Sequence, residues 1–496
     1  MSILNDNIDF LNWNTIIRYL LIFAIILIGG AIFKDGMAIL IALLILFYAL
    51  SRNLYRTLEI LLIWFFTYGY FLGQGYISVD FLSRYIVKPS FLLVVVFFIF
   101  QNKIPRNILK QRFIVIWLFF LLLTLISSVI QLQSPFVIIS LSSFFLMYFL
   151  MQEKSLKYFH YSKFLNLFIA VAILQTAVSF LQVLELLPPP SVFFIDGYGE
   201  QLEWIAALDD VASGTFGPDG SHLTSWYASL ISLLLILMWI VTKNKSYLLL
   251  LFITFLQFAT VDSKTILAVT ILMMLYLAFF LYIKKTAFQI NMGRYLFFIF
   301  FIFVGIFGFY KAWNMYYEYS SAGEFRANLN DVYENEVTDS RNIILNDIGN
   351  WGKIKGFQYI FADFIENDPL QIIWGYGIQG FSNNVKMSYI ESKDNSSMEF
   401  NNLTNSRSGL IKQFALSGVL GFILFVIAVI QWYNYCRQRA KGKSGLIKSS
   451  LLRIYLPFTL LASFLYSIEI TSIPVIAFAT IISIYENMAQ LNIDKT

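Results

Sequence analysis

Cysteine and histidine are almost absent from this chain of 496 residues. There is one cysteine, Cys436, and there are two histidines, His160 and His222. A single cysteine excludes an intramolecular disulfide, and so few thiols and imidazoles leave no cluster with the spacing of a metal site. A glycine-rich nucleotide-binding loop is also missing from the sequence. We therefore expect no metal and no cofactor.

Charge is scarce as well: Asp, Glu, Lys and Arg make up 13% of the chain, whereas 58% is hydrophobic. A soluble domain cannot bury so much apolar surface, so the composition predicts a protein that crosses a membrane many times. Continuous apolar runs indicate spanning helices, because the strands of a β-barrel alternate instead. We predict an all-α polytopic membrane protein with about fourteen transmembrane helices, near 15–33, 36–50, 54–73, 85–101, 112–132, 135–151, 164–186, 222–242, 246–261, 264–283, 295–313, 409–434, 449–467 and 472–487.

Lysine and arginine are unevenly divided among the loops. Alternate loops are rich in them, such as 103–112 and 437–448, whereas 187–221 has none and contains six acidic residues. Because basic loops stay in the cytoplasm, both termini are predicted to be cytoplasmic, and 187–221 and 314–408 external. These loops account for the net charge of +5, so we expect no binding of nucleic acid.

This topology divides the chain into five parts. They are the N-terminal transmembrane helices (1–186), an external acidic loop (187–221), central transmembrane helices (222–313), a large external loop (314–408) and the C-terminal transmembrane helices (409–496). Both external segments are too long to be simple connectors. Apolar residues recur at helical spacing around Ile354 to Phe364, so we expect the large loop to contain helices.

An enzyme on the outer face needs an activated donor that arrives through the membrane, and a lipid-linked pyrophosphate sugar is such a donor. Arginine suits a departing pyrophosphate because its planar fork binds phosphate oxygens with two hydrogen bonds and stays charged. The alternative role for a cation at a membrane edge is an anchor that reaches the lipid headgroups. The outward cations at the membrane edge are Arg84, Lys88, Lys264, Arg407 and Lys412.

Three stretches carry a resemblance to a known family. "RSGLIKQFALSGVLGF", from Arg407, has a polar pair followed by Gly418-x-x-Gly421 within a predicted helix. It resembles the signature of bacterial O-antigen ligases and O-antigen polymerases. "GTFGPDGSHLTSWYASL" resembles that family's Gly-Thr-Phe-Gly loop, and "IIWGYGIQGF" resembles the Gly-x-Gly-x-x-x-Phe turn of its large external loop. The order of these elements agrees over roughly residues 160–440.

The polar pair distinguishes the two branches of that family. Ligases have histidine followed by Asn, Ser or Gln, whereas this chain has Arg407-Ser408. Polymerases are described by an arginine, ten residues and a glycine. Arg407 to Gly418 fits that spacing, and so does Arg341 to Gly352. The missing histidine therefore favours a polymerase over a ligase.

The resemblance implies an inverting glycosyl transfer at the outer face of the bacterial cytoplasmic membrane. A glycan on undecaprenyl pyrophosphate would pass to a sugar hydroxyl of a new lipid-linked repeat, and a chain-length regulator could be a further partner. Arg407 would contact the pyrophosphate or the acceptor, Arg341 would act similarly from the large loop, and Lys264 could complete the cationic site.

The general base is less clear from the sequence. His222 ranks first, and Asp219 is a further candidate beside Asp209, Asp210 and Glu469. Each has a plainer alternative, since Asp219 in "GPDG" is typical of a turn and His222 stands at the start of a predicted helix. A good leaving group lowers the need for a base, so a site without one is also open.

Other functions stay open beside the polymerase. An O-antigen ligase shares the motifs, and a lipid-linked oligosaccharide flippase shares the expected helix count. A flippase needs polar or charged residues along an inner cavity. In this chain the polar residues inside predicted spans are mostly Gln175, Gln182 and Gln257.

Overall fold

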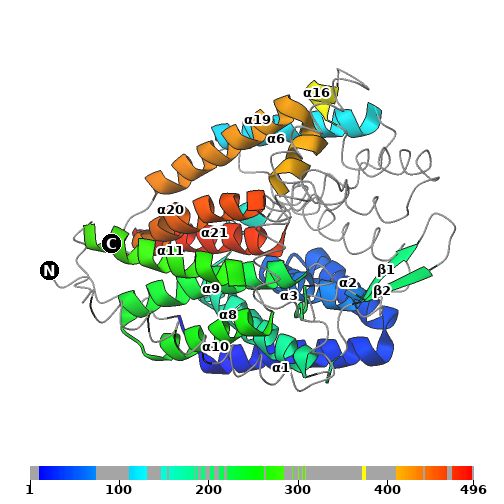
Figure 1. Cartoon of the computed structure of the whole chain (residues 1–496), viewed down its shortest axis with the longest axis vertical. Coiled ribbons are helices and arrows are strands. Elements are labelled where there is room, and N and C mark those ends of the chain that lie inside the picture. The colour runs from blue at the N-terminus through cyan, green and yellow to red at the C-terminus, as the bar shows by residue number, and fades with distance from the viewer. Residues whose placement is uncertain are drawn as a thin grey trace.

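The structure is a computed structural model in which long helices lie side by side, with one small β-hairpin (Figure 1). The helices are α1 (Trp13–Phe33), α2 (Asp35–Leu50), α3 (Leu54–Gly73), α6 (Arg112–Ile130), α8 (Tyr158–Val183), α9 (Gly220–Thr242), α10 (Ser246–Thr260), α11 (Lys264–Ile283), the short α16 (Gln371–Trp374), α19 (Gly409–Gln438), α20 (Gly442–Leu465) and α21 (Ile473–Ile493). The residues described are 10–73, 111–130, 147–152, 156–184, 186–187, 191–195, 201–205, 212–216, 220–261, 264–283, 371–375, 409–439, 442–465 and 472–493, with single positions at 293, 300, 304 and 308.

The predicted helical architecture is confirmed in outline. Each predicted span that falls on described residues is occupied by a helix, whereas 85–101 and most of 135–151 and 295–313 lie outside them. By length and apolar composition, α1, α8, α9 and α19 could each cross a membrane, and several shorter apolar helices accompany them. This arrangement is that of a helical membrane protein. The count of fourteen spans and their orientation stay predictions.

One hairpin departs from the all-α prediction. Strands β1 (Ser191–Ile195) and β2 (Gln201–Ile205) pair antiparallel, with Ser191 opposite Ile205, inside the loop predicted to be external and acidic. Their sequences, SVFFI and QLEWI, are rich in β-branched and aromatic residues, and two glycines stand between them. These features are typical of a hairpin. Apart from this hairpin, the described secondary structure is helical.

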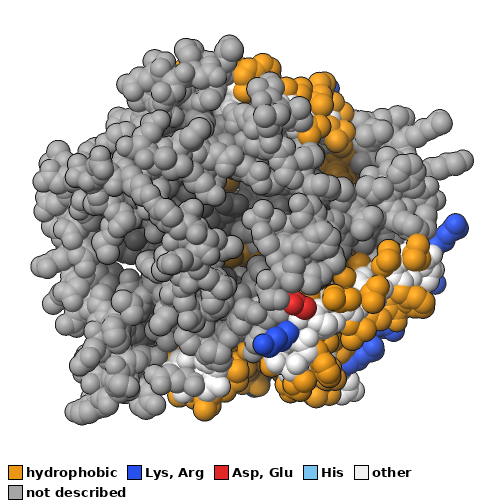
Figure 2. Space-filling view, turned by 90° about the vertical axis from the view of Figure 1, so that its right-hand side faces the viewer, with side chains coloured by type: hydrophobic (Ala, Val, Ile, Leu, Met, Phe, Trp, Pro, Cys, Tyr) orange, Lys and Arg blue, Asp and Glu red, His pale blue; other side chains and the backbone are white. Residues whose placement is uncertain are grey.

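Burial is graded from the centre of the bundle to its rim. α9 is almost entirely buried and packs against α8, α10, α11, α20 and α21. α1 at the rim buries one stripe, which includes Tyr19 and Phe23, and exposes another, which includes Ile25 and Ile32. Figure 2 shows the described hydrophobic side chains gathered along one side of the bundle, with several Lys and Arg side chains beside them. An apolar rim of this kind suits contact with lipid.

The start of α1 and the end of α21 lie at the same end of the bundle, which we call the terminal end (Figure 1). There the backbone N–H of Asn12 donates to Asn166 Oδ1 of α8 at 2.9 Å, and Asn487 Nδ2 of α21 donates to the carbonyl of Met151 at 2.8 Å. The opposite end, where α8 ends and α9 begins, carries the hairpin and α16, and we call it the loop end.

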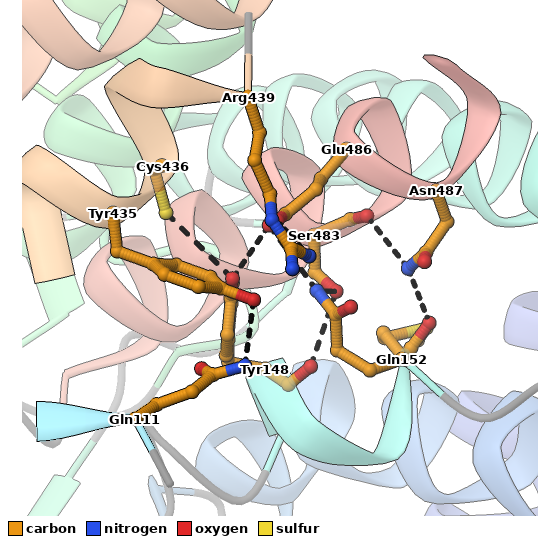
Figure 3. Close-up of polar contacts among 10 residues, drawn as sticks. Gln111, Tyr148, Gln152, Tyr435, Cys436, Arg439, Ser483, Glu486 and Asn487 are labelled. Atoms are coloured by element: carbon orange, nitrogen blue, oxygen red, sulfur yellow. Dashed lines mark hydrogen bonds and ion pairs between the residues drawn. The ribbon is translucent and has the colours of Figure 1, made fainter. Parts of the chain in front are cut away.

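A buried carboxylate fastens the terminal end (Figure 3). Glu486 of α21 is fully buried and accepts hydrogen bonds from Tyr148 Oη at 2.5 Å, Gln152 Nε2 at 3.2 Å and Arg439 Nη1 at 3.1 Å. Every donor comes from a different part of the chain than Glu486. Such a network stabilises the fold because a buried charge without partners would be very costly.

Candidate functional site

The first feature of the loop end is a buried turn, residues 212–216, which contains the Gly-Thr-Phe of the motif stretch. The backbone N–H of Thr215 donates to Gln175 Oε1 at 2.8 Å, and the Gln175 amide donates back to the Thr215 hydroxyl. That hydroxyl in turn donates to the carbonyl of Phe66 in α3 at 2.6 Å. The threonine thus ties the turn to both α3 and α8.

A second glutamine of α8 holds the preceding residues of the turn. Gln182 Oε1 accepts from the backbone N–H of Ser213 at 3.1 Å and of Gly214 at 2.9 Å, while its Nε2 donates to the carbonyl of Gly214 at 3.3 Å. Gln175 and Gln182 are seven residues apart, two helical turns, and so lie on one face of α8. These two glutamines inside an apolar span therefore hold the turn.

Glycine is required at position 214 for two reasons. Its φ is +63°, a backbone conformation that a side chain strains. A Cβ at this position would also lie 2.0 Å from Gln175 Oε1. The Gly-Thr pair therefore has a structural explanation in this turn.

His222, the first choice for a base, lies next to this turn in the first turn of α9. The Thr224 hydroxyl, two residues later, donates to the carbonyl of Ser213 at 2.6 Å and so joins the start of α9 to the turn. His222 is half-buried, and its Nδ1 atom is buried. Of the two roles predicted for His222, general base or helix-start residue, the structure shows the second. Asp219 lies outside the described residues.

The second feature of the loop end is a backbone contact between two glycines of separate motif stretches. Gly375 follows α16 with φ +75°, and Gly418 lies within α19 with φ +63°. A Cβ on Gly375 would be 2.4 Å from the backbone nitrogen of Gly418, and a Cβ on Gly418 would be 2.5 Å from the carbonyl oxygen of Ile373. The Ser127 hydroxyl of α6 donates to the carbonyl of Gly375 at 3.4 Å. Only glycines allow this approach.

The helix around Gly418 differs from the prediction. The Gly418-x-x-Gly421 motif was expected within a regular helix, but α19 is broken at Gly418, whose φ and ψ of 63° and −173° are not helical. The break has a physical cause: the backbone of α16 occupies the space beside Gly418, so the helix opens to receive it. The motif therefore marks a kink.

An apolar groove lies beside this contact. It has a volume of about 290 Å³ and is formed by α6, α19 and α16. Its lining residues are Phe119, Leu122, Leu123, Ile126, Trp374, Leu420 and Leu424. Several of them are exposed at the surface of the bundle, so the groove opens where a membrane protein meets lipid.

The predicted cations are only partly covered by the described residues. Lys412 lies in the first turn of α19, six residues before Gly418, and Lys264 is the first residue of α11; the side chains of both are outside the description. The remaining predicted site residues lie outside the described residues altogether: Arg84, Lys88, Arg341 and Arg407. The cationic site therefore stays a prediction.

Sequence reasoning missed the residues that build this end of the molecule. Gln175 and Gln182 stood out as polar residues in an apolar run, which was the available signal, but their partner was not deduced. Ser127 gave no signal, because one serine near a helix end is common.

Comparison with known proteins adds no family to these features. No protein-family model matches the chain, and no curated protein is significantly similar to it. Membership of the O-antigen family thus stays a prediction. It depends on the three motif stretches, two of which are in contact through Gly375 and Gly418.

Proposed function

We propose that the chain is a membrane glycosyltransferase that polymerises undecaprenyl-pyrophosphate-linked oligosaccharide repeats into O-antigen or a capsular polysaccharide. A hydroxyl of the incoming repeat attacks the anomeric carbon of the growing glycan, and the bond from that carbon to the pyrophosphate oxygen breaks. Undecaprenyl pyrophosphate leaves with the electron pair, and the hydroxyl proton passes to a base or to water. The reaction takes place at the outer face of a bacterial cytoplasmic membrane.

The contact between Gly375 and Gly418 is the observation that carries this proposal. The resemblance singled out "IIWGYGIQGF" and "RSGLIKQFALSGVLGF" as separate stretches of sequence, and their glycines pack backbone to backbone. Chance glycines in a chain with 26 of them have no reason to meet in this way. A shared role for the two stretches accounts for their meeting.

The surroundings of that contact suit a lipid-linked substrate. The apolar groove beside it is open to the side of the bundle and has the character that an isoprenoid tail requires. Lys412 lies in the first turn of the same helix, and Arg407 precedes the first residue of that helix by two positions in the sequence. A tail in the groove and a pyrophosphate at these cations would place the reacting end at the loop end.

The roles of the remaining residues follow from the chemistry. Arg407 and Arg341 would neutralise the departing pyrophosphate, and Lys264 would add a third positive charge. Lys412, Arg84 and Lys88 would bind substrate at the membrane edge. His222 is proposed as the base, with Asp219 beside it in the sequence.

The test is polymerisation by the purified protein in lipid, with a synthetic undecaprenyl-pyrophosphate-linked repeat as both donor and acceptor. We expect a ladder of longer glycans on a gel. Arg407→Ala should abolish the ladder while the melting temperature stays that of the wild type. Arg437→Ala, at the exposed far end of the same helix, is the matched control and should leave the ladder unchanged.

The alternatives give different products in the same assay. Transfer of single glycans to lipid A without a ladder would replace the polymerase with a ligase, and movement of unpolymerised lipid across the bilayer would indicate a flippase. A ladder of normal length from Arg407→Ala would refute the role of that arginine.

A further inference from the structure

Three buried polar side chains, from the end of α8, the turn 212–216 and the end of α10, lack hydrogen-bond partners within the described part of the chain. Among the described residues, the Ser179 hydroxyl, the Ser213 hydroxyl and both ends of the Gln257 carboxamide have no hydrogen-bond partner. All three residues are fully buried. Buried polar groups in native proteins nearly always have a partner.

Helix register brings Gln257 of α10 level with Ser179 of α8. The Thr176 hydroxyl of α8 donates to the carbonyl of Ile253 in α10 at 3.3 Å, which aligns these two positions. Two turns further on, Val183 of α8 packs with Val261 at the end of α10. With a rise of about 1.5 Å per residue, Ser179 is about 4.5 Å above the first contact and Gln257 about 6 Å above it.

The faces of the two helices agree with this register. Gln257 lies one turn from both Ile253 and Val261, so it shares the α10 face that touches α8. The Ser179 hydroxyl lies 3.4 Å from where a Cβ of Gly214 would be, so it lies beside the turn. Ser213 is joined to Gln182 and is preceded by Ala212, which packs on Val183 and Val261.

We propose that a bound water bridges the Ser179 hydroxyl, the Ser213 hydroxyl and the Gln257 carboxamide behind the turn 212–216. A buried water makes about three hydrogen bonds to groups that would otherwise lack a partner, and this site offers that number of residues. The carboxamide can donate or accept, and so can each hydroxyl, so a water that bonds one end of the carboxamide and both hydroxyls makes three hydrogen bonds.

The bridge would link α10 to the turn that the two glutamines already hold to α8. The turn is bonded to the first turn of α9 through Thr224, so the water would couple the end of α10 to the helix start that carries His222. This coupling does not depend on the proposed glycosyl transfer. It holds for any function of the loop end.

Stability measurements distinguish a hydrated site from a dry one. If water bridges these groups, Gln257→Met and Ser179→Ala should each lower the melting temperature in detergent by a few degrees. The melting temperature of the double variant should equal that of the less stable single variant, because both changes remove the same bridge. In a dry site, Gln257→Met would remove an unpaired buried amide and would raise the melting temperature, and the two changes would add. That result would overturn the proposal.

Radiolytic footprinting gives an independent readout, because ionised bound water oxidises the side chains beside it. We expect oxidation of buried Val183 and Val261 in the wild type and a several-fold loss in the double variant. Phe164, equally buried near the other end of α8, should stay unlabelled in both proteins. Absence of labelling at Val183 and Val261 in the wild type would contradict a bound water. A melting temperature that rises with sodium but not with choline would instead indicate a cation and would also overturn the proposal.

Discussion

The two ends of the bundle use polar side chains in opposite ways. At the terminal end, both oxygens of the Glu486 carboxylate accept hydrogen bonds, from Tyr148, Gln152 and Arg439 (Figure 3). At the loop end, Gln257 has donors and acceptors without a partner among the described residues, and two glycines bring backbones into contact. The Glu486 network is satisfied by its own chain, whereas the described part of the loop end has polar groups left without a partner.

This difference suggests that the terminal end stabilises the bundle and the loop end binds a ligand. A saturated network has nothing left to offer a ligand, so the terminal end holds helices together. The side chains of Lys448 and Ser450 in α20 are also buried and have no hydrogen-bond partner among the described residues, so the saturation is that of the Glu486 network alone. The loop end places tight turns, a kinked helix and an apolar groove together, which suits a site that receives a substrate. Changes at the two ends should therefore separate stability from activity.

Gly418→Ala should have the largest effect. A Cβ would lie within 2.6 Å of the backbone of α16 and would occupy a left-handed conformation, and backbone atoms cannot move aside as a side chain can. Strain and overpacking together should cost about 3 kcal/mol or more. We expect a much lower melting temperature and loss of polymerisation. Gly36→Ala in α2, where a Cβ would meet only Phe33 at 3.8 Å, is the control and should change little.

Glu486→Gln should have the next largest effect, and on stability alone. The amide keeps the shape of the side chain but turns an acceptor into a donor that faces Tyr148, Gln152 or Arg439. Loss of hydrogen bonds to a buried charge should lower the free energy of unfolding by about 3 kcal/mol. Polymerisation per folded molecule, assayed well below the melting temperature, should equal that of the wild type. An active-site defect with unchanged stability would break the proposed division between the two ends.

The helices of this fold were predictable from the sequence, because a backbone in lipid must satisfy its own hydrogen bonds and long apolar runs have few alternatives. The hairpin was not predicted because the acidic residues and prolines of 187–221 indicated only an external loop. The pattern of SVFFI and QLEWI around two glycines carried the signal. Local sequence pattern therefore carries the signal for both the helices and the hairpin.

The contacts of the candidate site were less predictable. The motif stretches drew attention to Gly375 and Gly418, but only the fold shows that they touch and that α19 breaks at Gly418. Glu486 lies inside the predicted span 472–487, and its partners come from 147–152 and 439, so no local pattern could identify them. Partners that are distant in sequence are set by packing.

Gly214→Ala should have the smallest effect of the three, and it should be rescued in part. The atom in the way is Gln175 Oε1, the end of a flexible side chain, so the amide can move and give up its bonds to Thr215. Together with the left-handed conformation this should cost about 2 kcal/mol. Adding Gln175→Ala makes room, so the double variant should be about 1 kcal/mol more stable than the sum of the single changes predicts. Thermal unfolding of the four proteins gives this coupling, and strict additivity would mean that Gln175 is not what requires glycine at this turn.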